Sequence, residues 1–207
     1  MQTNRTLIVE PVAVYEETLA KPVDFAALFG NDHPVEMEIG CGKGTFITQQ
    51  AEARPEVNFF GIEWAKFYWR YTCDRLRRRA TAGNARCLRA DAGKFVADLL
   101  ADDCLDVIHI YFPDPWPKAR HNKRRLIQPP FLEQVHRILK PGGRLQVVTD
   151  HLDYWQQIEQ VVPASPLTVV DYQQPGSAAD GEFVGTNFER KYIEEGRKFH
   201  AIAAIKQ

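Results

Sequence analysis

The amino-acid sequence predicts an α/β fold in which a mostly parallel sheet carries helices on both faces. Short segments rich in Val, Ile and Phe alternate with segments of helical spacing, which is typical of repeated strand–helix units. Residues 105–112 form an almost continuous apolar run, as expected of a central parallel strand buried on both faces. A turn with alternating glycines, 40–44, directly follows the first of these strands.

The first half of the chain contains three predicted strands and three predicted helices. Pro55 ends the first helix, and a run of three arginines at 77–79 suits the negative end of the second helix. The third strand ends at Asp91 and is followed by a short helix. We expect strands over 35–39, 57–63 and 85–90, and helices over 45–53, 64–79 and 94–100.

The second half continues the alternation and ends in a strand. Three alternate prolines within 113–117 exclude a helix there and predict a shaped loop after the central strand. The sequence Lys-Pro-Gly-Gly at 140–143 closes a helix, and a Gly- and Ser-containing loop covers 175–181. We expect strands over 105–112, 144–149 and 199–205, and helices over 131–139, 153–162 and 187–195.

Length and composition are typical of one soluble domain. The 207 residues can build a single sizeable core, so we expect one domain over 1–207, with residues 1–30 as a candidate mobile segment. Four widely spaced cysteines without a CxxC pair argue against a zinc site or a disulfide framework. No signal-peptide core or membrane-spanning run is visible, and we expect a cytoplasmic protein without a membrane partner or a metal.

Acidic side chains follow the predicted strands at the edge where ligands bind in such sheets. Glu38 lies just before the glycine turn, and Glu63, Asp91, Asp114 and Asp150 close the next four strands. The glycine turn allows close approach of a nucleotide cofactor, and Glu63 is placed to accept hydrogen bonds from a ribose. A plain tight turn with surface acids is the alternative. The acids favour a cationic cofactor over a dinucleotide pyrophosphate, although Glu38 could instead bind loop amides.

A basic segment follows the proline-shaped loop. Five Lys or Arg residues and no acid lie within 118–125, although the whole chain has a net charge of −1. Such a segment can bind phosphates, and Trp116 before it can stack on a base or pack in the core. A solvated basic loop is the alternative, but the segment adjoins the expected cofactor site, which favours RNA binding.

Four segments, taken in order, resemble the tRNA (guanine-N7-)-methyltransferase family of the bacterial TrmB type. They are Glu-Ile-Gly-Cys-Gly-Lys-Gly at 38–44, Gly-Ile-Glu-Trp at 61–64, the stretch 112–125 and Thr-Asn-Phe-Glu-Arg-Lys at 186–191. The PDPWPKxRHxKRR pattern is the specific one, and the resemblance spans about 35–191. It implies a class I methyltransferase (Rossmann-like) fold with a mostly parallel seven-stranded sheet. No clear basic arm precedes Val35, which leaves the N-terminal contribution to tRNA binding open.

The resemblance also implies the cofactor S-adenosylmethionine, the substrate tRNA and a set of site residues. The expected target is N7 of the guanine at variable-loop position forty-six, with Asp114 as the catalytic residue. Cofactor contacts are implied for Glu38, Gly40, Gly42, Gly44, Glu63, Asp91 and Asp114. Substrate contacts are implied for Lys118, Asp150, Thr186, Asn187, Phe188 and Glu189. RNA contacts are implied for Arg120, His121, Asn122, Lys123, Arg124 and Arg125.

The chemistry agrees with these residue types. Guanine N7 has a lone pair and no proton, so alignment with the methyl group matters more than a general base. Asp114 could recognise the N1–H and N2–H₂ edge of guanine, and Asp114 or Asp150 could stabilise the positive charge that develops. Thr186 and Glu189 have the spacing of a capping box as well as that of a substrate contact, and the two roles are compatible.

Other residues are interpreted as structural. The aromatic residues Trp64, Phe67, Tyr68 and Tyr71 share helical spacing, so we expect them in the core rather than in a base-stacking site. The histidines outside the basic segment show no metal-ligand spacing. Rival functions are a methyltransferase of the same fold acting on another RNA or a protein, a nicotinamide-dependent oxidoreductase and a catalytically silent RNA-binding protein. A monomer and a homodimer are both compatible with the sequence.

Overall fold

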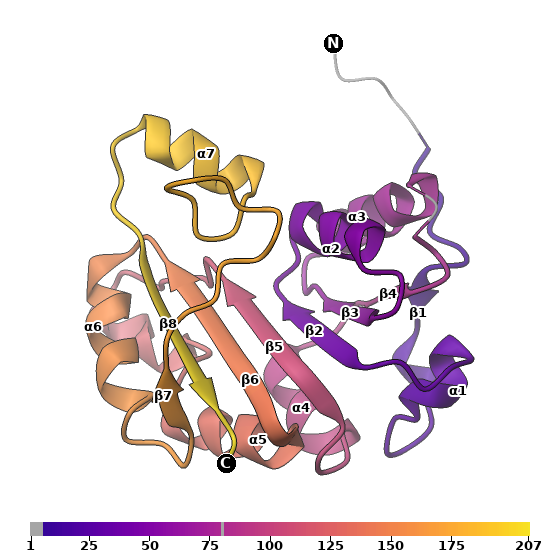
Figure 1. The fold of residues 1–207 in the computed structure, drawn as a ribbon, viewed down its shortest axis with the longest axis horizontal. Coiled ribbons are helices and arrows are strands. Elements are labelled where there is room, and N and C mark those ends of the chain that lie inside the picture. Colours follow the sequence, from indigo (N-terminus) through magenta and orange to yellow (C-terminus); the bar gives the residue numbers. More distant parts are fainter. Residues whose placement is uncertain (1–5, 80) are drawn as a thin grey trace.

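An eight-stranded sheet runs through the computed structural model, which describes residues 6–79 and 81–207 and leaves out the side chain of Asn187 (Figure 1). The strand order is β1-β4-β3-β2-β5-β6-β8-β7, and only β8 runs antiparallel to its neighbours. The strands are β1 (Ala13–Val14), β2 (Val35–Ile39), β3 (Asn58–Ile62), β4 (Ala85–Leu88), β5 (Leu105–Tyr111), β6 (Leu139–Thr149), β7 (Thr168–Val170) and β8 (His200–Ile205).

The predicted fold class is confirmed, and the sheet has eight strands, against the seven implied by the resemblance and the six located by residue range. The two-residue strand β1 pairs with β4 and extends the sheet at one edge. It escapes sequence analysis because two residues show no periodicity. The short strand β7, likewise unforeseen, forms the other edge.

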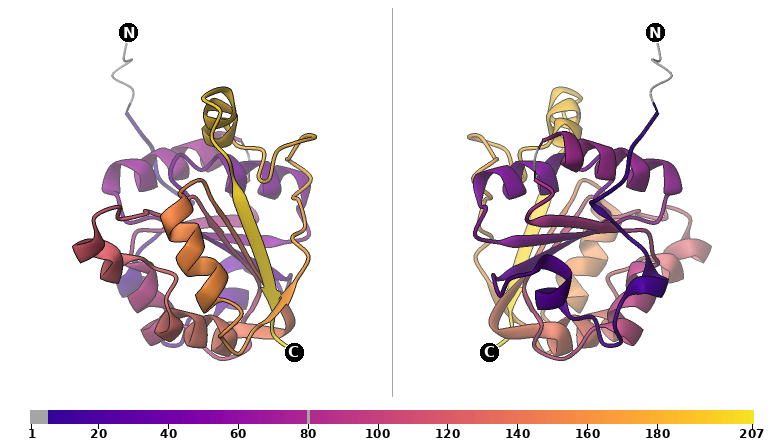
Figure 2. Two further views of the ribbon diagram at one scale, coloured as in Figure 1. Left: turned by 90° about the vertical axis from the view of Figure 1, so that its left-hand side faces the viewer. Right: turned by 90° about the vertical axis from the view of Figure 1, so that its right-hand side faces the viewer.

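Helices cover both faces of the sheet. The α-helices are α1 (Phe25–Phe29), α2 (Thr45–Ala53), α3 (Lys66–Arg78), α4 (Ala92–Leu99), α5 (Pro129–Ile138), α6 (Leu152–Val161) and α7 (Asn187–Glu194). Helices α2 and α3 pack on one face of β3 and β4, and α4, α5 and α6 lie on the opposite face. Helix α7 stands beyond the end of the sheet instead of covering a face (Figure 2).

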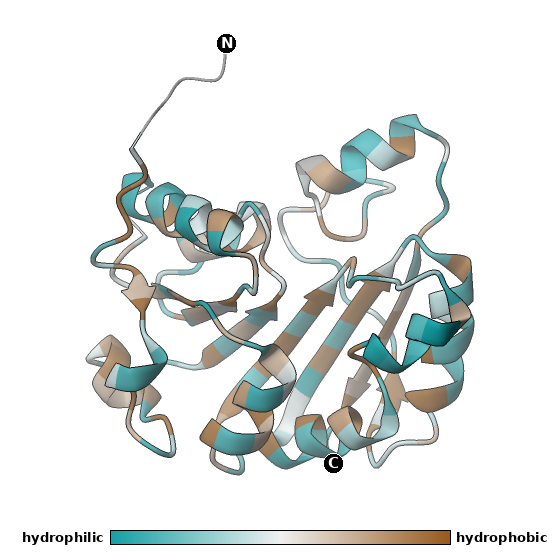
Figure 3. Cartoon of the chain, turned by 180° about the vertical axis from the view of Figure 1, so that it is seen from behind, coloured by the Kyte–Doolittle hydropathy of each residue, from teal (hydrophilic) through white to brown (hydrophobic). Residues whose placement is uncertain are grey.

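The two faces of the sheet have separate apolar cores. On the α4 side, Phe60 of β3 packs against Phe25 of α1 and Phe95 of α4, with ring centroids 5.4 and 5.5 Å apart. On the α3 side, Trp69, Cys73 and other apolar side chains cover Phe59. The view from behind shows hydrophobic and hydrophilic residues alternating around the helices, as one-sided burial requires (Figure 3).

The N-terminal segment belongs to the packed structure from about residue 12. Val12 is fully buried, and Val23, Phe25 and Phe29 are more than 90% buried. The described part of 1–30 thus contributes apolar side chains to both cores. Residues 1–5 lie outside the described residues. Within 6–79 and 81–207, no helix is both long and apolar enough to cross a bilayer.

Element boundaries differ from expectation mainly near the site. The basic segment forms a 3-10 helix, η2 (Ala119–Arg124), where a loop was expected. Helix α3 begins at Lys66, two residues after the predicted start, because Glu63 and Trp64 belong to the turn after β3. Strand β6 begins at Leu139 instead of 144 and continues through Pro141 and the two glycines.

Candidate functional site

A cavity of about 1160 Å³ opens at the carboxyl ends of the strands, between α3 and α7. It lies where the fold predicts a ligand site, since β2 and β5 are neighbours from which the chain proceeds in opposite directions. Of the predicted site residues, the cavity is lined by Glu38, Gly40, Gly42, Glu63, Asp114, Arg124, Thr186 and Phe188.

The glycine turn between β2 and α2 has the backbone that its sequence predicts. Gly40, Gly42 and Gly44 all have positive φ angles, of 80°, 51° and 65°. At Gly44 a methyl group would also lie 2.6 Å from Cγ2 of Thr72 in α3. Thr72 donates a hydrogen bond from Oγ1 to the carbonyl oxygen of Gly42 at 2.8 Å. Gly44 thus allows α3 to pack against the turn, while Gly40 and Gly42 face the cavity.

The side chains of Glu38 and Glu63 accept hydrogen bonds from backbone amides in and after this turn. Glu38 is 7% exposed, and its Oε2 accepts a hydrogen bond from the Ile47 amide at 3.2 Å. Burial, with a smaller contribution from the nearby Glu63, raises the pKa of Glu38 from the ordinary 4.5 to about 8, against the hydrogen bond from Ile47 that lowers it. Glu63 accepts hydrogen bonds from the amides of Gly42 at 2.9 Å and Ala65 at 2.7 Å. The amide that Glu38 binds belongs to the first turn of α2 and not to the glycine turn, and Glu38 also lines the cavity.

The other two acids differ in position. Asp91 caps α4 by accepting from the Lys94 amide at 3.1 Å, and its neighbours Ala90 and Ala92 line the cavity. Asp114 is exposed and lines the cavity itself, after β5. Asp114 is therefore the acid best placed to meet a substrate that enters from solvent.

The turn around Asp114 has a strained backbone. Phe112 and Trp116 both have positive φ angles, of 52° and 44°, which bulky residues rarely adopt. Phe112 packs against Phe188 of α7, with ring centroids 4.9 Å apart, and Trp116 lies beneath the guanidinium of Arg124 at 5.0 Å. Strain of this kind persists where surrounding contacts hold it, and it concentrates at functional sites.

Arg125 differs from its predicted role in RNA contact. It is 3% exposed, and its guanidinium donates to the Pro115 carbonyl oxygen at 2.8 Å and to Gln157 at 3.0 Å. It also pairs with Asp153 and lies over the ring of Tyr154. These contacts use the N–H groups of the Arg125 guanidinium to attach the proline loop to α6, and they leave none directed toward a phosphate in solvent.

The remaining residues of the basic segment stay at the surface. Arg120, Lys123 and Arg124 are exposed, and Arg124 also lines the cavity. His121 packs edge-on against Trp116 with centroids 6.0 Å apart. The side-chain amide of Asn122 lies 3.1 Å from the carbonyl oxygen of Trp116 and 3.3 Å from that of Lys118, to which its nitrogen can donate. Together with the exposed Lys118, four cations of the segment thus face solvent, while His121 and Asn122 shape the segment.

The predicted substrate residues divide between the cavity and structural contacts. Thr186 and Phe188 line the cavity, and Thr186 caps α7 by accepting from the Glu189 amide at 3.2 Å. Glu189 is fully buried, and its carboxylate accepts the amides of Phe183, Val184 and Gly185. Only the Thr186 half of the capping box forms, because Glu189 reaches further back along the chain than Thr186.

Lys118 and Asp150 are not among the lining residues. Lys118 is exposed at the start of η2. Asp150 accepts a hydrogen bond from Arg197 at 2.7 Å. Asn187 begins α7, but its side chain lies outside the described residues.

The expectation that the α3 aromatic residues lie in the core is wrong for three of the four. Trp64 is 66% exposed, Phe67 65% and Tyr68 41%. Tyr71 is half-buried, and Trp64, Tyr68 and Tyr71 line the cavity. The core positions of α3 are taken by Trp69, Thr72, Cys73 and Leu76, a second stripe with the same helical spacing.

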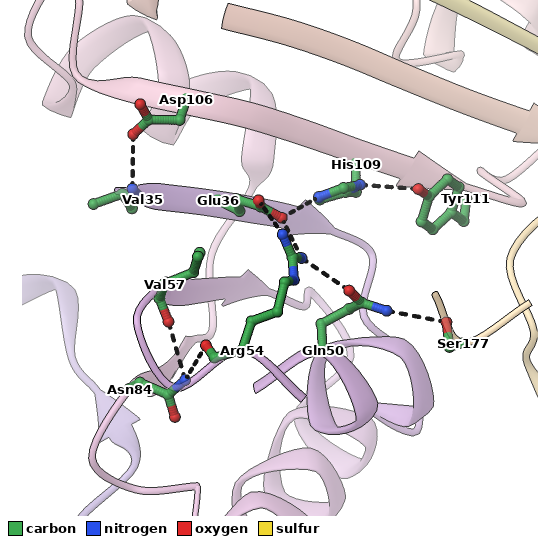
Figure 4. Close-up of polar contacts among 10 residues, drawn as sticks. All are labelled: Val35, Glu36, Gln50, Arg54, Val57, Asn84, Asp106, His109, Tyr111 and Ser177. Atoms are coloured by element: carbon green, nitrogen blue, oxygen red, sulfur yellow. Dashed lines mark hydrogen bonds and ion pairs between the residues drawn. The ribbon is translucent and has the colours of Figure 1, made fainter. Parts of the chain in front are cut away.

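A polar network lines a second cavity, of about 660 Å³, on the α2 side of the sheet (Figure 4). Glu36 of β2 accepts two hydrogen bonds from Arg54, at 2.6 and 2.8 Å, and pairs with His109 of β5 at 2.9 Å. Burial disfavours the charged form of Glu36 and would raise its pKa, but the hydrogen bonds from His109 and Arg54 outweigh this effect and lower the pKa to about 2.

The network also reaches the segment before α7. Gln50 accepts from Arg54 and donates to Ser177 at 3.0 Å, and Ser177 donates to the Val184 carbonyl oxygen at 2.9 Å. Gly185 packs so closely on Ser177 that a methyl group would lie 2.0 Å from the Ser177 carbonyl oxygen. The sequence held no signal for these contacts, since the partners are 127 positions apart for Gln50 and Ser177.

The described part of the chain contains no cluster of three or more His, Cys, Asp or Glu residues suited to a metal ion. Cys41 and Cys87 are buried thiols with sulfur atoms 3.7 Å apart beneath the glycine turn. Burial and the surrounding acids raise the pKa of the Cys41 thiol above its ordinary value, against a hydrogen bond with Cys87 that lowers it. Cys41 therefore fills space under the turn as a small residue.

The sequence is similar to known methyltransferases. A family model described as "Putative methyltransferase" matches residues 32–202. A "tRNA (guanine-N(7)-)-methyltransferase" of Syntrophotalea carbinolica is 36% identical over 94% of this chain and 84% of its own length. A protein of the same description from Rhodopirellula baltica is 40% identical over 92% of this chain and 73% of its own length.

Solved structures share the fold at low sequence identity. An antibiotic-related methyltransferase superimposes with a TM-score of 0.63 at 17% identity, covering 87% of this chain and 92% of its own. A SAM-dependent methyltransferase from Aquifex aeolicus gives 0.58 at 13% identity, covering 88% of each chain. These likenesses concern the fold alone.

Proposed function

Because the chain belongs to the tRNA (guanine-N(7)-)-methyltransferase family, we propose that it transfers a methyl group from S-adenosylmethionine to N7 of guanine in tRNA. The target we propose is the variable-loop guanine at position forty-six. The observation that carries the proposal is the cavity, where the glycine turn and Glu38 lie across from Asp114, Phe188 and the exposed arginine of the basic segment.

The residues of the glycine turn fit S-adenosylmethionine. Gly40 and Gly42 leave the turn without side chains on the cavity side. Glu38 is a buried carboxyl whose raised pKa makes a nearby cation favourable, since a cation would stabilise its charged form. Glu63 has lone pairs left after its two amide hydrogen bonds and can accept from ribose hydroxyls. Asp91 is proposed to act at the adenine end, beside Ala90 and Ala92.

When bound, S-adenosylmethionine supplies a methyl group on a positively charged sulfur. N7 of guanine carries a lone pair and no proton, so no residue of the protein would have to act as a general base there. The protein therefore has to hold nucleophile, methyl and sulfur in line and to keep water out. Asp114 is proposed to accept from N1–H and N2–H₂ of the guanine, and its charge stabilises the cationic product base.

The remaining predicted residues are proposed to bind the RNA. Lys118, Arg120, Lys123 and Arg124 offer exposed cations for the phosphates near the target base. Thr186 and Phe188 form the α7 side of the cavity, where Phe188 offers a ring face to the guanine. Asp150 and Glu189 are proposed to act by positioning Arg197 and the 183–185 segment.

The test is methyl transfer from labelled S-adenosylmethionine to an unmodified tRNA transcript. A second transcript has adenine in place of the variable-loop guanine. Label in the first only, released by cleavage specific for N7-methylguanine, supports the proposal. Label in both moves the target to another nucleotide. Cofactor binding without label on either transcript points to another acceptor.

Asp114→Asn tests the proposed selection of guanine. We expect a loss of turnover with cofactor affinity retained, because the substitution replaces one of the two acceptor oxygens by an NH₂ donor, which cannot accept from the guanine edge. Full turnover with unchanged guanine selectivity would remove Asp114 from that role.

A further inference from the structure

Helix α3 presents an unexplained aromatic surface beside the cavity. Phe67, Tyr68 and Tyr71, called here the α3 aromatic face, form one contiguous group, with Phe67 centred 5.5 Å from Tyr68 and 6.4 Å from Tyr71. Phe67 is 65% exposed and Tyr68 41%. Exposing such rings to water is unfavourable, and the core of this face is already filled by Trp69 and Leu76. The rings therefore serve something other than folding.

The α3 aromatic face continues into a row of arginines. Tyr68, Tyr71, Arg75 and Arg78 lie three or four positions apart, so they form one stripe on the helix, and all four line the cavity with Arg79. From Tyr68 to Arg78 the stripe is about 15 Å long, the length of about four stacked nucleotides. Rings occupy its N-terminal part and guanidinium groups its C-terminal part.

Charge indicates the partner. Residues 66–79 include six Lys or Arg residues and a single acid, Asp74, in a chain whose net charge is −1. Asp74 pairs with Arg77 and Arg78, and Arg75 donates to the Lys43 carbonyl oxygen and to Thr45. Arg79 lies 3.6 Å from Glu52 of α2, and the six cations still outnumber the two acids. Aromatic faces flanked by cations suit unpaired nucleotides, because bases stack on the rings while phosphates meet the arginines.

The position of the stripe fits the substrate of the proposed reaction. Residues of α3 line the cavity on one side, and Phe188, Lys191 and Tyr192 of α7 line it on the other. Figure 1 shows that α3 and α7 stand apart at the same end of the sheet. A guanine that enters this cavity has to leave its stack, and its neighbours in the strand then pass over one of the two rims. The α7 side and the basic segment supply one rim, and the stripe on α3 supplies the opposite one.

We propose that the α3 aromatic face and the arginines that continue it form a second RNA-binding wall, on which unpaired nucleotides next to the target guanine stack. This inference rests on the proposed function, because it takes tRNA as the substrate. The cofactor is the other candidate for the rings, since Trp64 and Tyr68 lie close to Glu63 along the chain. Phe67 argues against it, because this ring faces solvent and does not line the cavity.

The experiment compares ring-removing and ring-keeping substitutions in the whole protein. Tyr68→Leu and Phe67→Leu keep an apolar side chain but remove the ring, whereas Tyr68→Phe and Phe67→Tyr keep it. Val169→Ser on edge strand β7, an exposed apolar residue far from the cavity, is the matched control. Binding of an unmodified tRNA transcript and of S-adenosylmethionine is measured separately for each variant.

We expect each leucine variant to lower tRNA affinity by about five- to a hundredfold, with the tyrosine or phenylalanine counterpart near wild type. S-adenosylmethionine affinity stays within about twofold in all of them. A transcript with 2-aminopurine beside the target guanine is quenched on binding to the wild type and less so with Tyr68→Leu. Arg79→Gln lowers the slope of affinity against salt concentration, since one phosphate contact is lost.

Two outcomes overturn the proposal. Loss of cofactor affinity with unchanged tRNA affinity would assign the rings to the cofactor. Unchanged binding of both ligands in Tyr68→Leu and Phe67→Leu would leave the surface without a role toward RNA. A failure of the proposed function would be recognised separately. In that case the wild-type protein would bind tRNA and quench 2-aminopurine but would produce no N7-methylguanine.

Discussion

Cofactor affinity should rise with pH because of Glu38. This carboxyl is buried under the glycine turn, and its pKa is raised to about 8 by burial and by the neighbouring Glu63. Below pH 8 the free protein therefore holds Glu38 mainly as the neutral acid. S-adenosylmethionine carries a sulfonium and an ammonium, and a cation beside Glu38 favours the carboxylate. Binding should then release a proton.

The size of the effect follows from the difference in pKa between the free and the bound protein. If the bound cation returns Glu38 to the ordinary value near 4.5, the dissociation constant falls about tenfold per pH unit between pH 6 and 7.5. The curve flattens above pH 8, where the free protein is already ionised. From pH 6 to 8 the total gain is about fiftyfold, or about 2.3 kcal/mol.

Isothermal titration calorimetry at several pH values, in buffers of different ionisation enthalpy, measures affinity and proton release together. We expect release of close to one proton at pH 6.5. The nucleoside 5′-methylthioadenosine lacks both cations and should bind with little dependence on pH. In Glu38→Gln, S-adenosylmethionine affinity should be low and nearly flat with pH. A flat wild-type curve, or the same slope in Glu38→Gln, would refute the assignment of the titrating group.

Three further predictions concern the supports of the site. Gly185→Ala should abolish activity, because its methyl group would lie 2.0 Å from the Ser177 backbone. Gly181→Ala is the control: Gly181 has a similar φ of 83° and open space around it, so this variant should lose only about 1–2 kcal/mol of stability. Equal losses of stability in urea unfolding of the two variants would contradict the role of the close contact. Arg125→Ala should lower the free energy of unfolding by about 3 kcal/mol and leave the salt dependence of tRNA binding unchanged. Arg120→Ala should weaken the salt dependence of tRNA binding and leave the free energy of unfolding unchanged. A changed salt dependence in Arg125→Ala would support its predicted RNA contact. Glu36→Gln should lower the free energy of unfolding by about 3 kcal/mol at pH 7. The lowered pKa of Glu36 stabilises the fold above pH 4.5, and this contribution is lost as the pH falls toward 2. If urea unfolding at pH 4 and below shows the same difference between the variant and the wild type as at pH 7, the explanation is wrong.

The fold was predictable because its strands are short, apolar and followed by helices in regular order. Glu38, Glu63 and Asp114 were placed at the same edge of the sheet by their positions after strands, and they do line one cavity. The glycine turn was predictable for a similar local reason. Periodicity, turn residues and strand order carry this information without knowledge of distant contacts.

Burial within the site was not predictable in this way. Arg125 and Arg124 are neighbours in one basic segment, yet one is locked under the proline loop and the other faces the cavity. The two stripes of α3 have equal helical spacing, and the sequence alone does not say which one meets the sheet. Trp69 with Cys73 and Leu76 forms the buried stripe, which leaves Tyr68 and Tyr71 on the cavity side.

The arrangement of the two stripes on α3 explains how one helix contacts both the glycine turn and the cavity. Thr72 and Arg75 donate hydrogen bonds to the glycine turn, so the helix is fixed to the cofactor side of the site. Glu63 accepts from Ala65 just before α3 begins, which fixes the start of the helix to the end of β3. Any RNA held on Tyr68 and Tyr71 would therefore be positioned by the same contacts that shape the turn. Substrate alignment and cofactor binding would then share one rigid element, as a reaction governed by alignment requires.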